Sequence, residues 1–248
     1  PRSALSYWDG DKCVLHASSQ SQSFPVPSVA AYIGIAPERL VFIAEFCGGG
    51  FGSKGSGYPY LAIPALMSKK INRPVMMRIS RAEEAQIGSS RHGFQGRVRL
   101  GFGSDGKLLA ADLYIVQENG PTDGFNDWLS AGDALSLVYT PIAMRFRGVP
   151  VLTNTPHRGP QRGPGQNQLA MAIEPLIDKA ARELGLDPVV IRKINAPNSS
   201  STYGGSESKV TSAYLSDALQ KGADLFNWNE RKLRSGEKNG TKVRGIGV

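Results

Sequence analysis

The sequence has few residues that bind metals or form disulfides, and no run of apolar residues as long as the roughly 18 that a membrane-spanning helix needs. Its two cysteines, Cys13 and Cys47, are far apart and neither forms a Cys-x-x-Cys pair. They exclude a disulfide framework and a cysteine-ligated iron–sulfur cluster. His16, His92 and His157 lack the spacing of zinc ligands. With no basic-then-apolar leader at the start, we expect a reducing, cytoplasmic location.

Acidic residues are also scarce relative to basic ones. The 248 residues include 29 Lys and Arg but 21 Asp and Glu, which gives a formal net charge of +8. This balance suits anionic partners, either nucleic acid or a phosphate-bearing cofactor, but a solvated basic surface would produce it equally well. Hydrophobic residues make up 40% of the chain, so it can bury a core and is not a disordered protein.

The order of the expected elements predicts an α+β fold, with mixed, mainly antiparallel sheets and packed helices, because no regular βαβ repeat is present. Strands are expected over 39–46, 73–80 and 145–154, and hairpins around Asp9-Gly10 and Asp105-Gly106. Helices are expected over 27–35, with Ser28 as N-cap, and over 62–70, 169–184, 187–194 and 214–228. Residues 120–135, rich in Gly, Asp and Ser, are expected to form a loop.

The first glycine-rich segment, "EFCGGGFGSKGSGYPY" at residues 45–60, follows an expected buried strand. Residues 50–55 match G-x-G-x-x-G, but Pro59 and Pro64 interrupt the stretch that follows, and no acidic residue occurs between Glu45 and Glu83. A dinucleotide site needs both a helix on the third glycine and that acidic residue, and Lys54 is misplaced for a P-loop. The segment alone could be a simple glycine turn, although a solvent loop has little reason to carry Phe51.

The second glycine-rich segment, "TPHRGPQRGPGQNQ", places Arg158 and Arg162 on proline-stiffened backbone just before the helix that begins near Leu169. Helix N-termini attract anions, and arginine offers two parallel donors to phosphate or carbonyl oxygens. The segment is therefore a candidate anion site, with a solvated turn as the alternative.

Taken together and in this order, four stretches resemble the molybdopterin-binding subunit of the xanthine dehydrogenase and aldehyde oxidase family. They are "WDGDKCVLHASSQSQSF", "GGGFGSK", "RPVMMRISRAEE" and "LTNTPHRGPQRGPGQNQ", and the helix "AARELGLDPVVIRKIN" adds to the likeness. The resemblance covers most of the chain. It implies a partial molybdopterin-binding region over 1–248, strand-rich over about 1–165 and helical with a linker over 166–248. The family's N-terminal domain and C-terminal catalytic half would be absent.

The resemblance assigns cofactor contacts to residues of both glycine-rich segments. Gln20 matches the family glutamine whose amide lies near an oxo ligand of molybdenum, where a donor that does not titrate suits the chemistry. Gly49, Gly50, Phe51 and Gly52 match the loop that passes the metal end of the cofactor. Arg162 matches the arginine whose backbone faces the same centre. No protein side chain is expected to ligate the metal.

Three positions of the implied substrate pocket depart from the pattern of purine-oxidising members. Gly55 stands where they carry glutamate, and Gly132 aligns with their pocket arginine. Gln161 stands where the family often has an aromatic residue. Without those charged groups to orient a purine ring, we expect an aldehyde or another N-heteroaromatic substrate.

The resemblance also implies what lies on other chains or domains. The family's general-base glutamate has no counterpart here, since Glu174 falls on an expected helix and Glu207 in the expected linker. We therefore expect no catalytic residue in this chain and no activity from it alone. The expected cofactor is molybdenum-molybdopterin, in the cytosine dinucleotide form. The remaining part of the molybdenum subunit, an iron–sulfur subunit and an FAD subunit are the expected partners.

Two other functions remain open from the sequence. A basic nucleic-acid-binding module would explain the positive charge and the run from Arg231 to Lys242, but no zinc site, helix-turn-helix or aromatic RNA-binding strand accompanies it. An assembly subunit that keeps the fold without the cofactor is the other alternative, and retention of Gln20, the glycine run and Arg162 argues against it.

Overall fold

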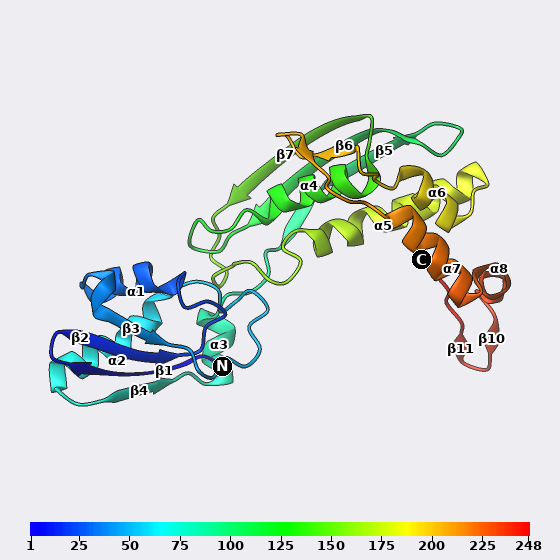
Figure 1. The fold of residues 1–248 in the computed structure, drawn as a ribbon. Helices are drawn as coiled ribbons and strands as arrows, with labels where there is room; N and C mark the ends of the chain where they lie inside the picture. The colour runs from blue at the N-terminus through cyan, green and yellow to red at the C-terminus, as the bar shows by residue number, and fades with distance from the viewer. The chain divides into compact units, whose positions relative to one another are not determined.

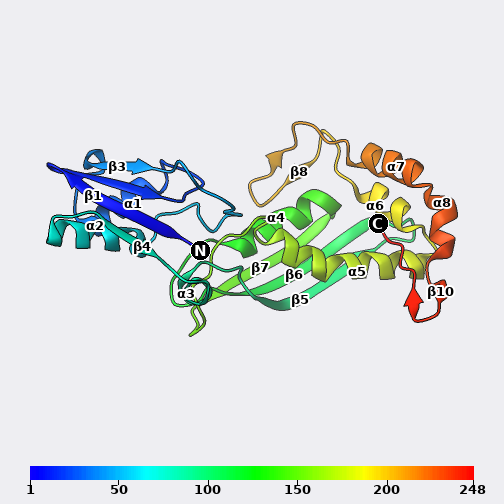
Figure 2. The ribbon, with the colours of Figure 1, turned by 90° about the horizontal axis from the view of Figure 1, so that it is seen from below.

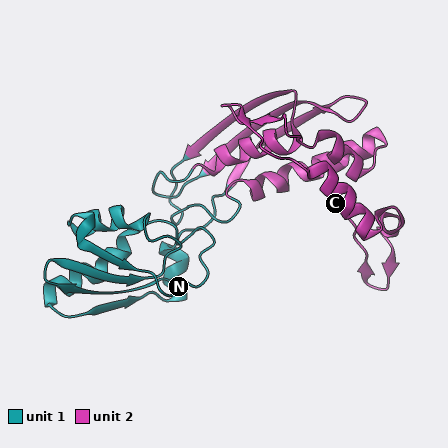
Figure 3. Ribbon diagram, viewed as in Figure 1, with its two compact units in different colours: residues 1–93, 118–125, 151–163 teal, residues 94–117, 126–150, 164–248 magenta.

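The computed structural model describes residues 1–248, which divide into two compact units. Unit 1 comprises Pro1–Gly93, Glu118–Phe125 and Val151–Gly163, and unit 2 comprises Phe94–Gln117, Asn126–Pro150 and Pro164–Val248 (Figure 3). The α+β class predicted from the sequence is confirmed, because helices pack on small sheets that are mainly antiparallel. The expected subdivision near residue 165 stays a prediction.

Unit 1 is built on a four-stranded sheet of order β3-β2-β1-β4 (Figures 1 and 2). β1 (Ser3–Asp9) and β2 (Lys12–Ala17) form the predicted hairpin, with Asp9 opposite Lys12. β4 (Val75–Arg78) pairs antiparallel with β1, whereas β3 (Leu40–Ile43) pairs parallel with β2. The sheet is therefore mixed, and the glycine-rich segment begins directly beyond its parallel edge strand.

Two helices, α1 (Pro25–Ile33) and α2 (Pro59–Ile71), supply the rest of the unit 1 core. Val29 of α1 and Leu61 of α2 are buried in the same core as Leu15 of β2. A short 3₁₀ turn (Pro37–Arg39) connects α1 to β3, and α3 (Arg81–Ile87) follows β4 with a capping box between Ser80 and Glu83.

The predicted N-cap of α1 is wrong. The helix begins at Pro25, so Ser28 lies inside it and its hydroxyl donates to the Pro25 carbonyl at 3.1 Å. Proline is favoured in a first turn because its missing N–H has no helical partner there. The helix expected over 62–70 likewise begins earlier, at Pro59, so Pro64 lies inside α2 and not near its start.

Unit 2 contains a three-stranded sheet of order β5-β6-β7. β5 (Phe94–Phe102) and β6 (Leu108–Glu118) form the second predicted hairpin, and β7 (Ala143–Val151) completes the sheet. Helices α4 (Asp127–Tyr139) and α5 (Gln166–Leu184) pack on its apolar face, where Leu113, Leu135 and Ile177 are buried together. The predicted left-handed cap of α5 at Gly185 is present.

The C-terminal part of unit 2 is a series of short elements. As predicted, Asp187 caps α6 (Pro188–Asn195) by accepting from the Val189 N–H at 2.8 Å. Two helices follow, α7 (Leu215–Phe226) and α8 (Trp228–Arg231), with a 3₁₀ turn after them (Lys232–Arg234). The remaining elements are two small hairpins, β8 (Thr202–Tyr203) with β9 (Ser208–Lys209) and β10 (Lys238–Asn239) with β11 (Lys242–Val243). None of the chain's helices combines the length and apolarity that a membrane-spanning helix needs.

The loop predicted over residues 120–135 is wrong in its second half, where α4 begins at Asp127. The composition is poor for a helix, but Ala131, Leu135 and Tyr139 recur on one face and are buried against the sheet and α5. Burial of that face outweighs a weak local preference.

Candidate functional site

The two glycine-rich segments lie against each other within unit 1. The Arg162 N–H donates to the Phe51 carbonyl at 2.6 Å, which joins the second segment to the first. A Cβ built on Gly52 would lie 2.5 Å from the Pro160 carbonyl oxygen, and Gly52 has φ +106°. Only glycine therefore permits this backbone contact in this conformation.

Gln20 links the end of the first hairpin to the same loop. Its side-chain Oε1 accepts from the Gly52 N–H at 2.9 Å and the Lys54 N–H at 3.1 Å, and its backbone N–H donates to the Lys54 carbonyl at 2.9 Å. A Cβ on Gly50 would collide with the Gln20 side chain. Because backbone donors occupy Oε1, the amide orientation is fixed and the Nε2 protons remain to serve another acceptor.

Phe51 lies at the exposed tip of this turn. It has φ +53°, a left-handed conformation that is unusual for a bulky residue, and its side chain is 65% exposed. The ring lies over Gly49, whose Cβ would approach it to 2.7 Å. A strained aromatic residue held out from a glycine turn is the kind of backbone outlier that clusters at binding sites.

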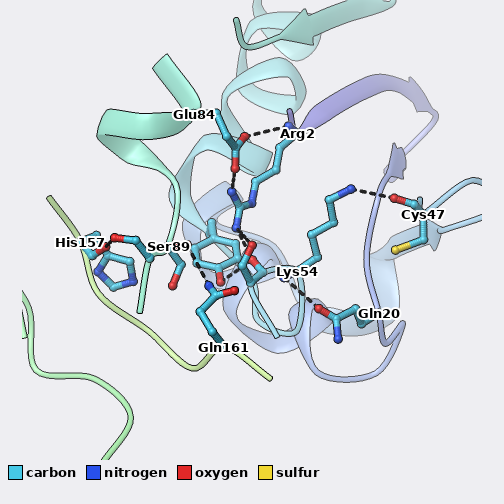
Figure 4. Close-up of polar contacts among 11 residues, drawn as sticks. Arg2, Gln20, Cys47, Lys54, Glu84, Ser89, His157 and Gln161 are labelled. Atoms are coloured by element: carbon cyan, nitrogen blue, oxygen red, sulfur yellow. Dashed lines mark hydrogen bonds and ion pairs between the residues drawn. The ribbon is translucent and has the colours of Figure 1, made fainter. Parts of the chain in front are cut away.

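Arg2 supports the loop from the interior. The side chain is buried, forms an ion pair with Glu84 of α3, and donates from Nη2 to the Ser53 carbonyl and, at 2.7 Å, to the Ser53 hydroxyl (Figure 4). The guanidinium carbon also lies 5.0 Å from the centre of the Tyr58 ring and 5.7 Å from that of Tyr60. These contacts hold a positive charge directly beneath the glycine turn.

Sequence reasoning missed Arg2, although a signal for it exists. Strand side chains alternate between faces, so Arg2 shares the inward face of the first hairpin with Ala4 and Ser6, and all three are buried. A charged residue in that register must find partners inside the fold.

Lys54 and the tyrosines complete the surroundings of the turn. Lys54 extends to the Cys47 carbonyl, with 2.7 Å between Nζ and the oxygen, and so spans the glycine run from its last residues to its first (Figure 4). The Tyr58 hydroxyl donates to the Ser53 carbonyl at 2.8 Å. Burial raises the pKa of the Tyr60 hydroxyl, so this ring stays neutral beneath the loop.

Three predicted pocket residues have different surroundings. The Gln161 amide donates to the Ser89 carbonyl at 3.0 Å, so its side chain is tied to the segment that follows α3. Gly55 has no left-handed backbone, and a Cβ there would meet only the Gly52 carbonyl oxygen, at 3.2 Å. Gly132 belongs to unit 2, where its Cβ would lie 2.5 Å from the Phe146 ring, so close helix–sheet packing requires a glycine there.

Arg158, half of the candidate anion site, has a structural role. Its guanidinium pairs with Glu118 at 3.0 Å and donates to the Ser90 hydroxyl at 2.7 Å. Its carboxylate partner already neutralises the charge, so Arg158 does not supply the anion-binding group. Arg162 remains exposed at the junction with Phe51.

The site fits a compact, oxygen-rich group better than a nucleotide phosphate chain. The loop combines a backbone folded tightly at its glycines against Gln20 and Pro160, a fixed amide whose Nε2 group is left to donate, and the exposed ring of Phe51, all in one small region. The helix that follows, α2, begins only at Pro59, after the turn has ended, so no helix N-terminus opens on the glycines. A dinucleotide site of the Rossmann type requires that helix.

Comparison with known proteins identifies the family. Residues 1–196 match the model of the molybdopterin cofactor-binding domain. The chain is 31% identical over 208 residues to the putative xanthine dehydrogenase molybdenum-binding subunit XdhA of Escherichia coli, which covers 83% of this chain and 28% of that protein. It is 30% identical over 254 residues to aldehyde oxidase 4 of Arabidopsis thaliana, covering 99% of this chain and 19% of that protein.

A comparison with solved structures points to the same family as these two relatives. The aldehyde oxidoreductase from Desulfovibrio gigas superposes with a TM-score of 0.88 at 27% identity, covering 97% of this chain and 27% of that one. The chain thus spans less than a third of the length of each of these three proteins. The chain belongs to the molybdopterin cofactor-binding domain family, that of the molybdenum-binding subunits of xanthine dehydrogenase and aldehyde oxidase.

Proposed function

We propose that this chain forms one wall of a molybdenum-molybdopterin pocket in an oxidoreductase that hydroxylates an aldehyde or a non-purine N-heteroaromatic compound. The observation that carries the proposal is Gln20, whose amide oxygen is held by two backbone N–H groups so that its Nε2 group is left as a donor. When bound, the cofactor supplies the redox chemistry, taking two electrons from a substrate that gains oxygen from water.

The chain's own residues would hold and orient the cofactor. Gln20 would donate from Nε2 to an oxo group of the cofactor, and a neutral amide keeps that donor at every working pH. Gly49, Gly50 and Gly52 would let the loop fold tightly against Phe51, Gln20 and Pro160 beside the cofactor, and Phe51 would exclude water from one side. Arg162 would present its backbone to the same group, held in place because its N–H donates to the Phe51 carbonyl. The general-base glutamate would come from outside this chain.

Gly55 supports the proposed substrate class. Its backbone is not left-handed, and a Cβ at this position would have one close neighbour, the Gly52 carbonyl oxygen at 3.2 Å, so a side chain needs only a small shift of the turn. With Gly55 in the pocket, as the resemblance implies, the pocket would lack the carboxylate that the resemblance associates with purines. Gln161 and Gly132 are proposed pocket residues from the resemblance alone, since packing against Phe146 already accounts for the glycine at position 132.

The remaining proposals concern the complete assembly. We propose the cytosine dinucleotide form of the cofactor, and iron–sulfur and FAD partners that carry electrons away in the cytoplasm. A phosphate-bearing cofactor suits a chain with a net charge of +8.

Elemental analysis of the chain purified with its natural partners tests the cofactor proposal. We expect molybdenum in the purified complex and turnover of aldehydes or quinoline-like heterocycles in preference to xanthine. A folded complex without molybdenum would instead favour an assembly subunit that has lost the cofactor. A complex that contains molybdenum but prefers xanthine would support the proposed cofactor and contradict the proposed substrate class.

A further inference from the structure

Arg2 makes more contacts than an ion pair with Glu84 requires. Its backbone N–H donates to Glu84 Oε2 at 2.9 Å and its Nη1 group to Oε1, which already holds α3 against the first strand. The Nη2 group points the other way, to Ser53, where it reaches both the carbonyl and the hydroxyl. The side chain is 3% exposed, so these bonds are made away from water.

The Ser53 contact acts on a single peptide group. The carbonyl of the Ser53–Lys54 peptide accepts from Arg2 and from the Tyr58 hydroxyl. The N–H of the same peptide donates to Gln20 Oε1 at 3.1 Å. A peptide is planar, so fixing its oxygen also fixes the direction of its N–H. A positive charge at the oxygen also polarises the group and strengthens the N–H as a donor.

We propose that Arg2 is a positioning residue that orients the Gln20 amide through the Ser53–Lys54 peptide. This inference rests on the proposed cofactor function for its consequence, the retention of molybdenum, but not for its geometry. Arg2 never reaches the pocket itself, since it is buried beneath the turn. Its effect is to hold the loop peptide that holds the glutamine.

The structure also explains why arginine is needed. One guanidinium can bond Glu84 and Ser53 at once because its donors form a rigid fork, whereas a lysine ammonium is a single compact group. Gly88 leaves room for this pair, because a Cβ there would lie 2.8 Å from Arg2 Nη1 and 2.6 Å from Glu84 Oε1.

The test uses the double variant Arg2→Met/Glu84→Gln in the full chain with its partners. The pair is changed together because removing only the cation would leave a buried carboxylate and risk unfolding. Hydrogen exchange is followed in peptides covering residues 50–56, and molybdenum content is measured after dialysis. We expect exchange at Lys54 to accelerate about tenfold, as when a charge-assisted hydrogen bond is lost. We also expect molybdenum retention to fall.

A double-mutant cycle with Gln20→Leu separates positioning from general stability. If Arg2 acts through Gln20, the Arg2→Met/Glu84→Gln change lowers molybdenum retention much less in the Gln20→Leu background than in the wild type. Arg2→Lys should give intermediate exchange, and Arg39→Met, which breaks only an exposed pair with Asp11, serves as the matched control.

Unchanged exchange at residues 50–56 in the double variant, or losses that simply add in the cycle, would overturn the proposal. If the double variant does not fold, unchanged exchange in Arg2→Lys decides against it in the same way. Absence of molybdenum from the wild-type complex would remove the cofactor function, and the exchange measurement would still decide whether Arg2 orients the loop peptide.

Discussion

Four of the six glycines in the first glycine-rich segment have different surroundings. Gly49 lies beneath the Phe51 ring, Gly50 against Gln20 and Gly52 against the Pro160 carbonyl, while Gly55 touches only its own turn. The sequence could predict that such a run brings backbone close to something, but not which glycines meet a ligand and which meet the protein. The strand register indicates that Arg2 is buried, but the sequence could not show its partners, which lie 51 and 82 residues further along the chain.

These surroundings predict different responses to alanine at two nearby positions. Gly52→Ala adds a left-handed strain and a clash with backbone at Pro160, so we expect a loss of about 2–4 kcal/mol in unfolding free energy. Gly55→Ala, the matched control, should cost under about 1 kcal/mol. Chemical denaturation measures both, and equal losses would contradict the separation.

Substrate preference is the second prediction at this scale. Gly55→Glu in the assembled enzyme restores the carboxylate that purine-oxidising relatives are expected to carry. We expect kcat/KM for xanthine to rise relative to that for an aldehyde, by about tenfold if one new charged hydrogen bond forms. Gly55→Gln, which lacks the charge, should shift the ratio less. If the ratio of the two kcat/KM values is unchanged in both variants, Gly55 does not line the substrate pocket.

Among the elements, the predictions from sequence succeed where capping and periodicity agree with burial. Asp187 and Gly185 mark helix ends by chemistry that depends only on neighbouring residues, so both were predictable. Helix α4 was not, because its glycine at position 132 and its polar residues disfavour a helix until Phe146 and the sheet are in place.

Asp187 also connects two helices and gives a pH-dependent prediction. Burial alone would raise the pKa of its carboxyl, but hydrogen bonds from Lys232, the Trp228 indole and the Val189 N–H outweigh it and lower the pKa. The folded state therefore binds the proton less well than the unfolded one. The contribution to stability is present above the ordinary carboxyl pKa of about 3.9 and is lost as the pH falls through the lower folded value.

Asp187→Asn should thus destabilise the chain by about 1–2 kcal/mol at pH 7, mainly by removing the pairing with Lys232. Asparagine can still accept from Val189 and Trp228, so the helix start should survive. Thermal unfolding at pH 7 and near pH 3 checks this, since the difference between wild type and variant should shrink at the lower pH. A difference that stays constant would assign the effect to packing.

At the scale of the whole molecule, unit 1 is assembled from three stretches that are separated along the chain, and Arg158 connects all three. It lies in the third stretch, its guanidinium bonds Ser90 of the first and Glu118 of the second, and its backbone N–H donates to the Asn119 carbonyl at 3.3 Å. Sequence patterns describe neighbours along the chain, so they suggested an anion site at Arg158 and could not show this assembly.

Arg158→Met should therefore loosen all three stretches together, with a loss of about 1–3 kcal/mol, because Glu118 would keep a half-buried charge without its partner. Hydrogen bonds from Thr155 and then Arg158 lower the pKa of Glu118, so wild-type stability should fall as the pH drops below the ordinary carboxyl range, and less steeply in the variant. Hydrogen exchange should accelerate in peptides near residues 90, 119 and 158. If exchange accelerates only near residue 158, the other two stretches of unit 1 keep their structure without the Arg158 side chain.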